Sequence, residues 1–412
     1  MRVLVLNHFA VPRGQPGGTR HVELFGGLPG WSATIIASRL NLTTGRPQPR
    51  ADGFVPVRVI PYRRNGLSRI LNWASYAVTA TFAGLRQPRP DVVYASSPHL
   101  LAGLAGWVIA TLRRSRLVLE IRDLWPQVLV DMGQLRETSR VYRLLVRLER
   151  FLYARADQIV IMATGSRPAV EAKGAAPEKI WYIPNAADPE DFRPTASRDE
   201  LRSRYGFTRP TAVYAGAHGP ANGLDLLLDA AEQVRDLDLD VVLVGDGVAK
   251  EALVAEARRR GLANVRFLDP VPKTEIPDLL HAADLGLHVL ADVPLFQHAV
   301  SPNKVFDYLA AGLPVLTNVP GVVAECVLEA GAGYAVAPTG IGDGLRRAVE
   351  QRQRDGGAEL RRMGHSGRSW IAANQTRAMM RQRLLDCLSG AAAPAPVPSP
   401  AGAGSRTDNQ SI

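Results

Sequence analysis

Short runs of apolar, often β-branched residues alternate with helix-length segments along most of the chain. The first series reads RVLVLN, ATIIA, VPVRVI, DVVYA, RLVLEI, DQIVIM and IWYI, and a second series reads TAVYAG, DVVLVG, NVRFL, DLGLHV, PVLT and GYAVA. This alternation is typical of parallel α/β sheets, whose strands are buried on both faces. The sequence therefore predicts an α/β fold with two Rossmann-like domains.

The two strand series are separated by the segment IPNAADPEDFRPTASRDELRSRYG, which is rich in Pro and Asp and has no strand period. We expect an N-terminal domain at residues 1–184 and a second domain at 185–370. A C-terminal helix at 371–390 is expected to return to the N-terminal domain. Residues 391–412 are rich in Ala, Pro and Ser and almost free of large apolar residues, so we expect them to be disordered.

Charge is shared unevenly between the two halves. Residues 1–190 hold 25 Lys and Arg against 13 Asp and Glu, a balance of +12, so the whole-chain charge of +10 leaves −2 for the rest. A basic field suits phosphates, nucleic acid or an anionic membrane. Because no aromatic and basic nucleic-acid motif stands out, we expect an anionic membrane surface and phosphorylated substrates as partners, and no nucleic acid.

Three features bear on the compartment. The N-terminus has too short an apolar run for a signal peptide, and no segment reaches the roughly 18 apolar residues of a membrane span. The apolar run at residues 100–112, followed by RRSR, fits either a buried core helix or a helix on a membrane surface. Cys326 and Cys387 form neither metal spacing nor a disulfide framework. We therefore expect a cytoplasmic protein, peripheral to the inner face of the cell membrane.

The stretch SPNKVFDYLAAGLPVLTNV starts at Ser301 and predicts a helix with Lys304 at its third position. A cation there opposes the helix dipole, which suggests that Lys304 faces an anion. Asp307 shares the same helix face. The amides at the helix start, with Asn303, and Lys304 would suit a diphosphate, and Asp307 would suit ribose hydroxyls. The alternative is an ordinary salt bridge between Lys304 and Asp307.

Two glycine-rich loops follow predicted strands and are further candidates for donor binding. In HFAVPRGQPGGTRHVEL, Gly17 and Gly18 could aim backbone amides at an anion, although a plain βα turn is the alternative. The cations Arg20 and His21 favour binding there. The loop AGAHGPANG of the second series supplies Gly216, His218 and Gly219, with the turn LVGDG close by. Neither loop has the G-x-G-x-x-G spacing of dinucleotide sites.

Candidate catalytic residues also lie after predicted strands, where open α/β sheets place their ligands. LEIRDLWP supplies Arg122 and Asp123, and SSPHLLAG supplies His99. Asp123 could instead cap the next helix, and a lone histidine such as His99 is more often structural.

These motifs together resemble a family 4 retaining glycosyltransferase of the GT-B fold, over roughly residues 1–385. The resemblance is carried by IPNAADPEDFRP, YAGAHGPANGLDLLLDAA, LVGDG, SPNKVFDYLAAGLPVLTNVPG and GVVAECVLEAGAGYAVAP. GGTRHVEL, RDLWP and SPNKVFDYLAAG are similar to the subgroup that transfers N-acetylfucosamine-type sugars to lipid-linked polysaccharide precursors. The resemblance implies two domains facing a central cleft, a nucleotide-sugar donor, expected to be UDP-linked, and a polyprenyl-diphosphate-linked acceptor, with no cofactor and no obligatory metal.

Carried over by position, Asp307 occupies the second glutamate of the family's E-x7-E motif, whose role is to hold the ribose. The first glutamate falls at Ala299, and the family's basic pair falls at Ala217 and Asn222. The resemblance therefore leaves Lys304 to supply the charge at the diphosphate, and Asp123 to orient or deprotonate the acceptor hydroxyl. Two rivals stay open, namely a GT-B nucleotide-sugar epimerase and a non-catalytic envelope-assembly scaffold.

Overall fold

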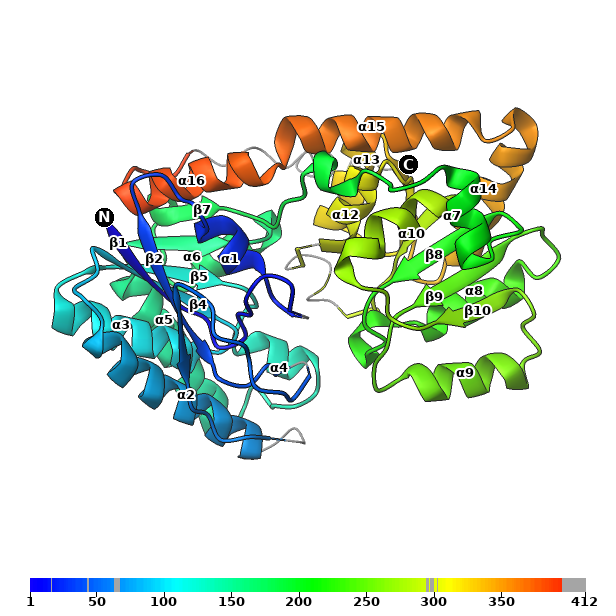
Figure 1. Ribbon diagram of the computed structural model, residues 1–412. Helices are drawn as coiled ribbons and strands as arrows, with labels where there is room; N and C mark the ends of the chain where they lie inside the picture. Colours follow the sequence, from blue (N-terminus) through cyan, green and yellow to red (C-terminus); the bar gives the residue numbers. More distant parts are fainter. Residues whose placement is uncertain are drawn as a thin grey trace, which may run out of the picture.

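The computed structural model describes residues 1–15, 17–42, 44–62, 67–293, 296, 300–301 and 303–394. They form two α/β domains that lie side by side (Figure 1). Each domain holds one sheet, in which all described strand pairs are parallel; the strand orders are β3-β2-β1-β4-β5-β6-β7 and β10-β9-β8-β11-β12-β13. Every segment predicted as a strand contains one, and the α/β fold is confirmed.

The first domain places a seven-stranded sheet between two helix layers. Side chains alternate along its strands, so that Leu4 and Leu6 pack toward α2, α3 and α5, whereas Val3 and Val5 pack toward α1 and the last helix. The elements are β1 (Arg2–Leu6), α1 (Arg20–Phe25), β2 (Ser32–Ser38), β3 (Phe54–Val57), α2 (Leu67–Arg86), β4 (Val92–Ser97), α3 (Leu100–Arg113), β5 (Arg116–Ile121), α4 (Gln127–Asp131), α5 (Arg140–Arg155), β6 (Gln158–Ile161), η1 (Thr164–Ser166), α6 (Arg167–Ala172), η2 (Pro177–Lys179) and β7 (Ile180–Tyr182).

The second domain repeats this plan with six strands. Its two cores lie on opposite faces of the sheet, one against α10, α12 and α13 and the other against α8, α9 and α14. The elements are η3 (Pro189–Phe192), α7 (Arg198–Tyr205), β8 (Thr211–Ala215), η4 (Pro220–Asn222), α8 (Asp225–Gln233), β9 (Asp240–Val244), α9 (Lys250–Arg259), β10 (Val265–Leu268), η5 (Lys273–Glu275), α10 (Ile276–Ala282), β11 (Leu285–His288), α12 (Asn303–Ala311), β12 (Val315–Thr317), α13 (Val322–Glu329), β13 (Gly333–Ala335), α14 (Ile341–Asp355) and α15 (Ala358–Asn374).

The last helix, α16 (Arg377–Ser389), leaves the second domain and lies on the first (Figure 1). Its buried residues Met380, Leu384 and Cys387 belong to the core of the first sheet. The chain crosses between the domains twice, and the crossings are tied together, because Gln375 Nε2 donates to Asn185 O at 3.0 Å. The two connections therefore meet at one place, beside the strand ends that carry the candidate site.

Helix α3 contains the apolar run at residues 100–112. Seven of its residues are buried, and a Cβ at Gly106 would lie 2.4 Å from the Cβ of Ala95 on β4. This close approach makes α3 a core helix, although Leu112 at its end is exposed. Among the described residues, no helix combines the length and the apolar character needed to cross a membrane.

The segment after α16 was expected to be disordered from residue 391. Ala391 O accepts from Gln158 Nε2 at 3.1 Å, and Ala393 N donates to Glu178 O at 2.9 Å. The first residues of this segment therefore bond to the first domain, and residues 395–412 lie outside the described residues.

Candidate functional site

Two loops of the second domain meet at the carboxyl ends of β8 and β9. Gly216 N donates to Val244 O at 2.9 Å, and His218 N donates to Asp246 O at 2.8 Å. A Cβ at Gly245 would lie 1.9 Å from Gly216 O, so glycine is required for this backbone approach. The structure thus brings the predicted AGAHG loop and the LVGDG turn into direct contact.

Lys304 projects from the start of α12 into the same region. Its ammonium lies 5.1 Å from the centroid of the Tyr214 ring. A Cβ at Gly216 would come within 2.2 Å of the lysine Cε, so Gly216 leaves the space that Lys304 fills. The described part of helix α12 begins at Asn303, and Pro302 before it lies outside the described residues, so the predicted third helical position of Lys304 stays a prediction.

The ammonium of Lys304 has no hydrogen-bond or ion-pair partner among the residues that the structure describes. Burial lowers its pKa to about 8, and the charge of Asp307 opposes that shift. A partly desolvated cation without an anion is unfavourable, and backbone amides at a helix start add positive potential. A negative group placed beside Lys304 would therefore be stabilised, which fits the predicted contact with a diphosphate.

Asp307 lies one turn further along α12, and its carboxylate likewise has no hydrogen-bond partner among the described residues. Burial raises its pKa to about 7, with the charges of Lys273 and Arg377 opposing the shift and Glu23 reinforcing it. No ion pair within 4 Å joins Lys304 to Asp307, although both are described. The salt-bridge alternative for this pair is therefore wrong, and both polar ends stay available.

Asp307 faces the place where the domains touch. Lys273 Nζ from η5 lies 3.1 Å from Glu23 Oε1 and from Thr19 Oγ1 of the first domain. Arg377 at the start of α16 bridges Glu23 and Asp188, with Nη1 at 3.1 Å from Asp188 Oδ2. These contacts hold the loop after β1, which contains Gly17 and Gly18, against the second domain.

The remaining predicted donor residues have simpler surroundings. Gly18 O accepts from Val11 N at 3.2 Å beside an isolated β-bridge between Ala10 and Gly18, and Gly219 O accepts from Asn222 N at 3.0 Å in the turn η4. Asn303 is exposed at the start of α12. Asn222 and Ala217 supply no cation, as expected, and Ala299 lies outside the described residues.

His218 is buried below the meeting loops. Neither ring nitrogen has a hydrogen-bond partner among the described residues, and solvent does not reach either of them. Burial lowers the pKa of its imidazole, and Lys250 lowers it further, which keeps the ring neutral. In this conformation a ligand cannot reach His218 unless the loop moves, so its predicted role in donor binding stays a prediction.

In the first domain, Arg122 and Asp123 follow β5 at its carboxyl end, as predicted. Neither side chain has a hydrogen-bond or ion-pair partner among the described residues. The Asp123 side chain is open to solvent, yet desolvation by the surrounding protein raises its pKa, while Arg122 and Arg69 oppose the rise. Pro126 occupies the N-cap position of helix α4, and the Asp123 side chain bonds to no described backbone amide, so the capping alternative is wrong.

His99 has both ring nitrogens engaged. Nδ1 accepts from Ala102 N at 3.2 Å and so caps α3, and Nε2 lies 3.0 Å from Nδ1 of His8. Burial holds the pKa of His99 well below its usual value, which keeps the ring neutral. The geometry gives His99 a structural role and offers no support for the predicted catalytic one.

Glu120, one strand position before Ile121, is a buried carboxylate that sequence reasoning missed. It accepts four hydrogen bonds, from Arg20 Nε at 3.0 Å, His21 Nε2 at 3.0 Å, Tyr94 OH at 2.6 Å and Ser96 Oγ at 2.8 Å. These donors and the charges beside it hold its pKa well below the usual range, against the effect of burial. The only signal in the sequence is a glutamate inside an apolar strand.

Arg20 and His21 therefore face inward and do not favour ligand binding at the glycine loop, which corrects the expectation drawn from their charge. Arg20 also donates to Ile183 O at 2.5 Å and to Pro184 O at 2.7 Å. It thus fastens α1 and Glu120 to the first crossing between the domains.

Comparison with known families agrees with this geometry. Residues 27–186 match the family described as a glycosyl transferase 4-like domain, and residues 209–355 match glycosyl transferases group 1. The two matches fall on the two α/β domains and together cover about three quarters of the chain. The chain belongs to the family 4-like glycosyltransferases of the GT-B fold.

Individual relatives are distant. WcaI of Escherichia coli, a glycosyl transferase assigned to colanic acid biosynthesis, is 27% identical over 261 residues, which are 61% of this chain and 64% of WcaI. The chain thus spans a little less than two thirds of that relative. WbjE of Pseudomonas aeruginosa, assigned as a glycosyltransferase, is 26% identical over 327 residues, 77% of each chain.

Solved structures show the same fold. The crystal structure of Anabaena HepE in complex with UDP has a TM-score of 0.70 at 18% identity, covering 94% of this chain and 100% of HepE. WaaG, a glycosyltransferase involved in lipopolysaccharide biosynthesis, has a TM-score of 0.68 at 17% identity over 94% of this chain and 100% of WaaG. At these identities the likeness establishes the fold alone.

Proposed function

We propose that this protein transfers a sugar from a UDP-sugar to a lipid-linked acceptor in cell-envelope polysaccharide biosynthesis, with retention at the transferred carbon. The observation that carries the proposal is the pair of charges on α12. Lys304 and Asp307 lie at the carboxyl edge of the second sheet, partly buried, and neither has a hydrogen-bond or ion-pair partner among the described residues. Parallel sheets bind their ligands at this edge.

The donor site follows from the chemistry of that pair. Lys304 and the start of α12 bind the diphosphate, because an ammonium beside helix amides stabilises negative charge. Asp307 accepts hydrogen bonds from the two ribose hydroxyls. UDP as the nucleotide is supported by HepE, whose structures are described as complexes with UDP and with UDP-glucose. As the sugar bond breaks, Lys304 stabilises the departing diphosphate.

The acceptor side is formed by Arg122 and Asp123 on the facing domain. Asp123 has a raised pKa and no hydrogen-bond partner among the described residues, which suits its carboxylate to orient the acceptor hydroxyl and accept its proton. In a front-face reaction the leaving phosphate could take that proton, and Asp123 would then only orient the hydroxyl. Arg122 provides a second unpaired cation for a phosphorylated acceptor. We expect the reaction to need neither a cofactor nor a metal ion.

Two observations bear on the identity of the sugar and of the acceptor. WcaI is assigned to colanic acid biosynthesis, and the motifs GGTRHVEL and RDLWP resemble the subgroup that uses N-acetylfucosamine-type sugars. A polyprenyl-diphosphate acceptor would need the enzyme to work at a membrane surface, which makes the surface of the first domain relevant.

Helices α2, α3 and α5 expose apolar side chains on that domain. Ile70, Val78 and Phe82 of α2 are 51%, 56% and 58% exposed, and they lie on one stripe because they are separated by eight and four residues. Leu112 and Leu144 are 64% and 65% exposed. Exposed apolar residues in this number mark an interaction surface.

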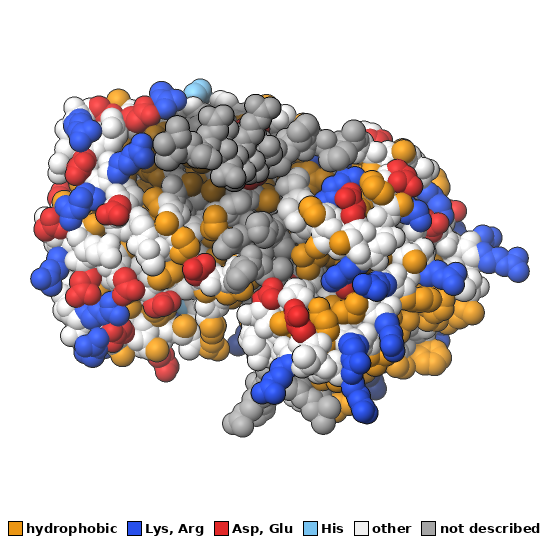
Figure 2. Space-filling model, turned by 180° about the vertical axis from the view of Figure 1, so that it is seen from behind, with side chains coloured by type: hydrophobic (Ala, Val, Ile, Leu, Met, Phe, Trp, Pro, Cys, Tyr) orange, Lys and Arg blue, Asp and Glu red, His pale blue; other side chains and the backbone are white. Residues whose placement is uncertain are grey.

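Basic residues accompany this apolar stripe. The exposed charges of α5 are all arginines, Arg140, Arg143, Arg147, Arg150 and Arg155. Figure 2 shows hydrophobic and basic side chains intermingled over the lower part of the first domain. Apolar residues beside cations suit a surface of anionic lipid. We therefore propose that the first domain rests on the cytoplasmic face of the membrane.

Product analysis tests the proposal. We would incubate the protein with UDP- and GDP-sugars, with and without polyprenyl-diphosphate saccharides, and identify products by mass spectrometry. We expect a lipid-linked product one sugar longer, formed from a UDP-sugar only when the acceptor is present. Turnover of the UDP-sugar without an acceptor would indicate an epimerase. Failure to bind any nucleotide would indicate a scaffold.

A further inference from the structure

A polar cavity lies in the second domain, away from Lys304 and Asp307 on α12. Its volume is about 600 Å³, and it is bounded by α7, α10, the end of α14 and the start of α15. Pro210, Asp284 and Pro314, which line it, immediately precede β8, β11 and β12. The cavity therefore opens at the amino ends of the strands, on the edge opposite to the donor site.

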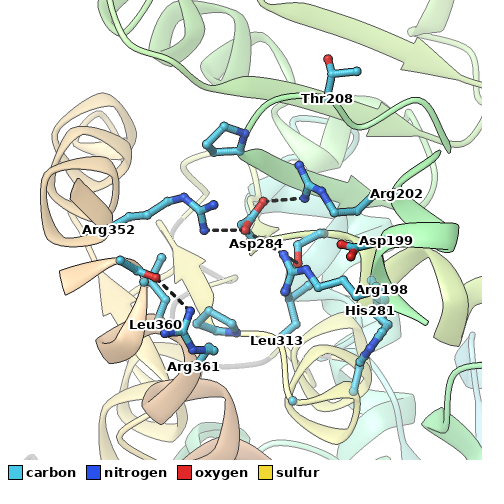
Figure 3. Close-up of a pocket in the computed structure, with 18 residues that line it drawn as sticks. Arg198, Asp199, Arg202, Thr208, His281, Asp284, Leu313, Arg352, Leu360 and Arg361 are labelled. Atoms are coloured by element: carbon cyan, nitrogen blue, oxygen red, sulfur yellow. Dashed lines mark hydrogen bonds and ion pairs between the residues drawn. The ribbon is translucent and has the colours of Figure 1, made fainter. Parts of the chain in front are cut away.

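One buried carboxylate at this cavity is surrounded by three guanidinium groups (Figure 3). Asp284 Oδ1 lies 2.8 Å from Arg198 Nη2 and 2.9 Å from Arg352 Nη1, and Oδ2 lies 3.0 Å from Arg202 Nη1. Thr211 N donates to Oδ2 at 2.9 Å. The carboxylate is thus fully engaged, but its single negative charge balances only one of three cations.

The charge of the cavity stays positive when all of its lining is considered. Arg361 adds a fourth guanidinium, and Asp199 is the only other carboxylate among the described lining residues. Burial lowers the pKa of Arg198, and the like charges of Arg202 and Arg352 lower it further. Crowded cations of this kind stabilise an incoming anion.

Two of the arginines, Arg352 and Arg361, use only one N–H group each in hydrogen bonds to described residues. Arg352 makes one hydrogen bond, to Asp284, and Arg361 makes one, from Nη1 to Gly356 O at 2.9 Å. Their other N–H groups have no partner among the described residues. Guanidinium groups recognise phosphate oxygens in pairs of parallel hydrogen bonds. The two side chains come from different helices and flank the same cavity in Figure 3.

We propose that this cavity binds a phosphorylated small molecule, with Arg352 and Arg361 holding its phosphate. Its volume is in the range of small-ligand pockets and accommodates a sugar phosphate. Arg198 and Arg202 supply the positive field but are committed to Asp284. The site does not depend on the nucleotide site, because the two lie at opposite edges of the sheet.

Calorimetric titration with ribose 5-phosphate at constant ionic strength tests the proposal, in the presence of saturating UDP to occupy the site at Lys304 and Asp307, with ribose as the uncharged control ligand. We expect the wild-type protein to bind ribose 5-phosphate and not ribose. Arg361→Gln should weaken binding about tenfold or more, because it removes a charge-assisted contact. This variant leaves the Asp284 cluster intact, and thermal unfolding would verify that it is folded.

Matched variants locate the binding. Arg362→Gln changes the same charge one residue away, on a side chain that pairs with Glu359 and does not line the cavity; it should bind like the wild type. Lys304→Met should also leave the affinity unchanged. The proposal is overturned if the wild type does not bind ribose 5-phosphate, if Arg361→Gln binds it equally well, or if Lys304→Met abolishes binding.

Discussion

The two domains carry charged groups at the same edge of their sheets, but the protein treats these charges in opposite ways. In the first domain Glu120 accepts four hydrogen bonds and is fully buried. In the second domain Lys304 and Asp307 have none from described residues. A charge whose partners are all protein groups stabilises the fold, whereas a partly buried charge without partners leaves free energy to be gained from a ligand.

Charges that bond within the protein should be the most sensitive to substitution, and the largest loss of stability is expected at Glu120. Glu120→Gln keeps the shape of the side chain but leaves Arg20 buried without its carboxylate. Breaking a buried ion pair from one side costs about 3–5 kcal/mol. We expect the free energy of unfolding, measured by urea denaturation, to fall by that amount. An unchanged free energy would mean that the Glu120 cluster is not structural.

Asp123 should behave in the opposite way, because its carboxylate has no hydrogen-bond or ion-pair partner among the described residues. Asp123→Asn should change the free energy of unfolding by less than about 0.5 kcal/mol. Turnover should fall about 100-fold or more, since general base catalysis of this size depends on the lost proton acceptor. Steady-state kinetics with a lipid acceptor gives the turnover number. If turnover is normal, Asp123 only shapes the surface.

The exposed arginines of α5 are a third kind of charge, for which the proposed partner is a membrane surface. Arg143→Gln with Arg147→Gln should weaken binding to anionic vesicles by about 2 kcal/mol, since each basic residue contributes about 1 kcal/mol. Arg258→Gln with Arg259→Gln on α9 makes the same charge change on the second domain and should have no effect. Vesicle flotation measures both. Equal binding to neutral vesicles would contradict an electrostatic contribution.

The smallest predicted effect is a pH dependence of uridine binding. The pKa of Asp307 is raised to about 7 in the free protein, and ribose hydroxyls donate to its ionised form. Affinity for uridine should therefore rise as the pH increases from 6 to 8, by about tenfold at most, because roughly a tenth of the carboxyl is ionised one pH unit below its pKa. Asp307→Asn should remove the dependence. A flat wild-type profile would exclude Asp307 as the ribose ligand.

The fold could be predicted from the sequence, because the apolar runs of both domains are typical of strands that are buried on both faces of a parallel sheet. It also singled out Lys304, since a cation at a helix start is locally unfavourable, and Asp123, since it follows a strand; the roles of both stay predictions. It could not reveal the partners of Glu120, because Arg20 lies 100 residues away in the chain. For the same reason, the charges of Arg20 and His21 wrongly suggested that these residues favour ligand binding.

His99 and the arginine cavity show the same limit. The ring nitrogens of His99 are engaged by Ala102 and by His8, 91 residues away in sequence. The cavity is lined by residues of several helices and loops, and only folding brings Arg198, Arg352 and Arg361 to one place. Local position in the sequence suggests candidate residues, whereas contacts between residues that are distant in the chain become visible only in the folded structure.

The most direct test of the account is calorimetric titration of the wild type, Lys304→Met and Asp307→Asn with UDP, uridine and 2′,3′-dideoxy-UDP. Lys304→Met should weaken the binding of UDP by about 1.5–3 kcal/mol, which is the value of a charge-assisted hydrogen bond, and leave the binding of uridine unchanged. Asp307→Asn should weaken the binding of UDP and of uridine by similar amounts, and it should abolish the preference for UDP over its dideoxy analogue. If both folded variants bind UDP as the wild type does, these charges do not hold a nucleotide, and the central claim fails.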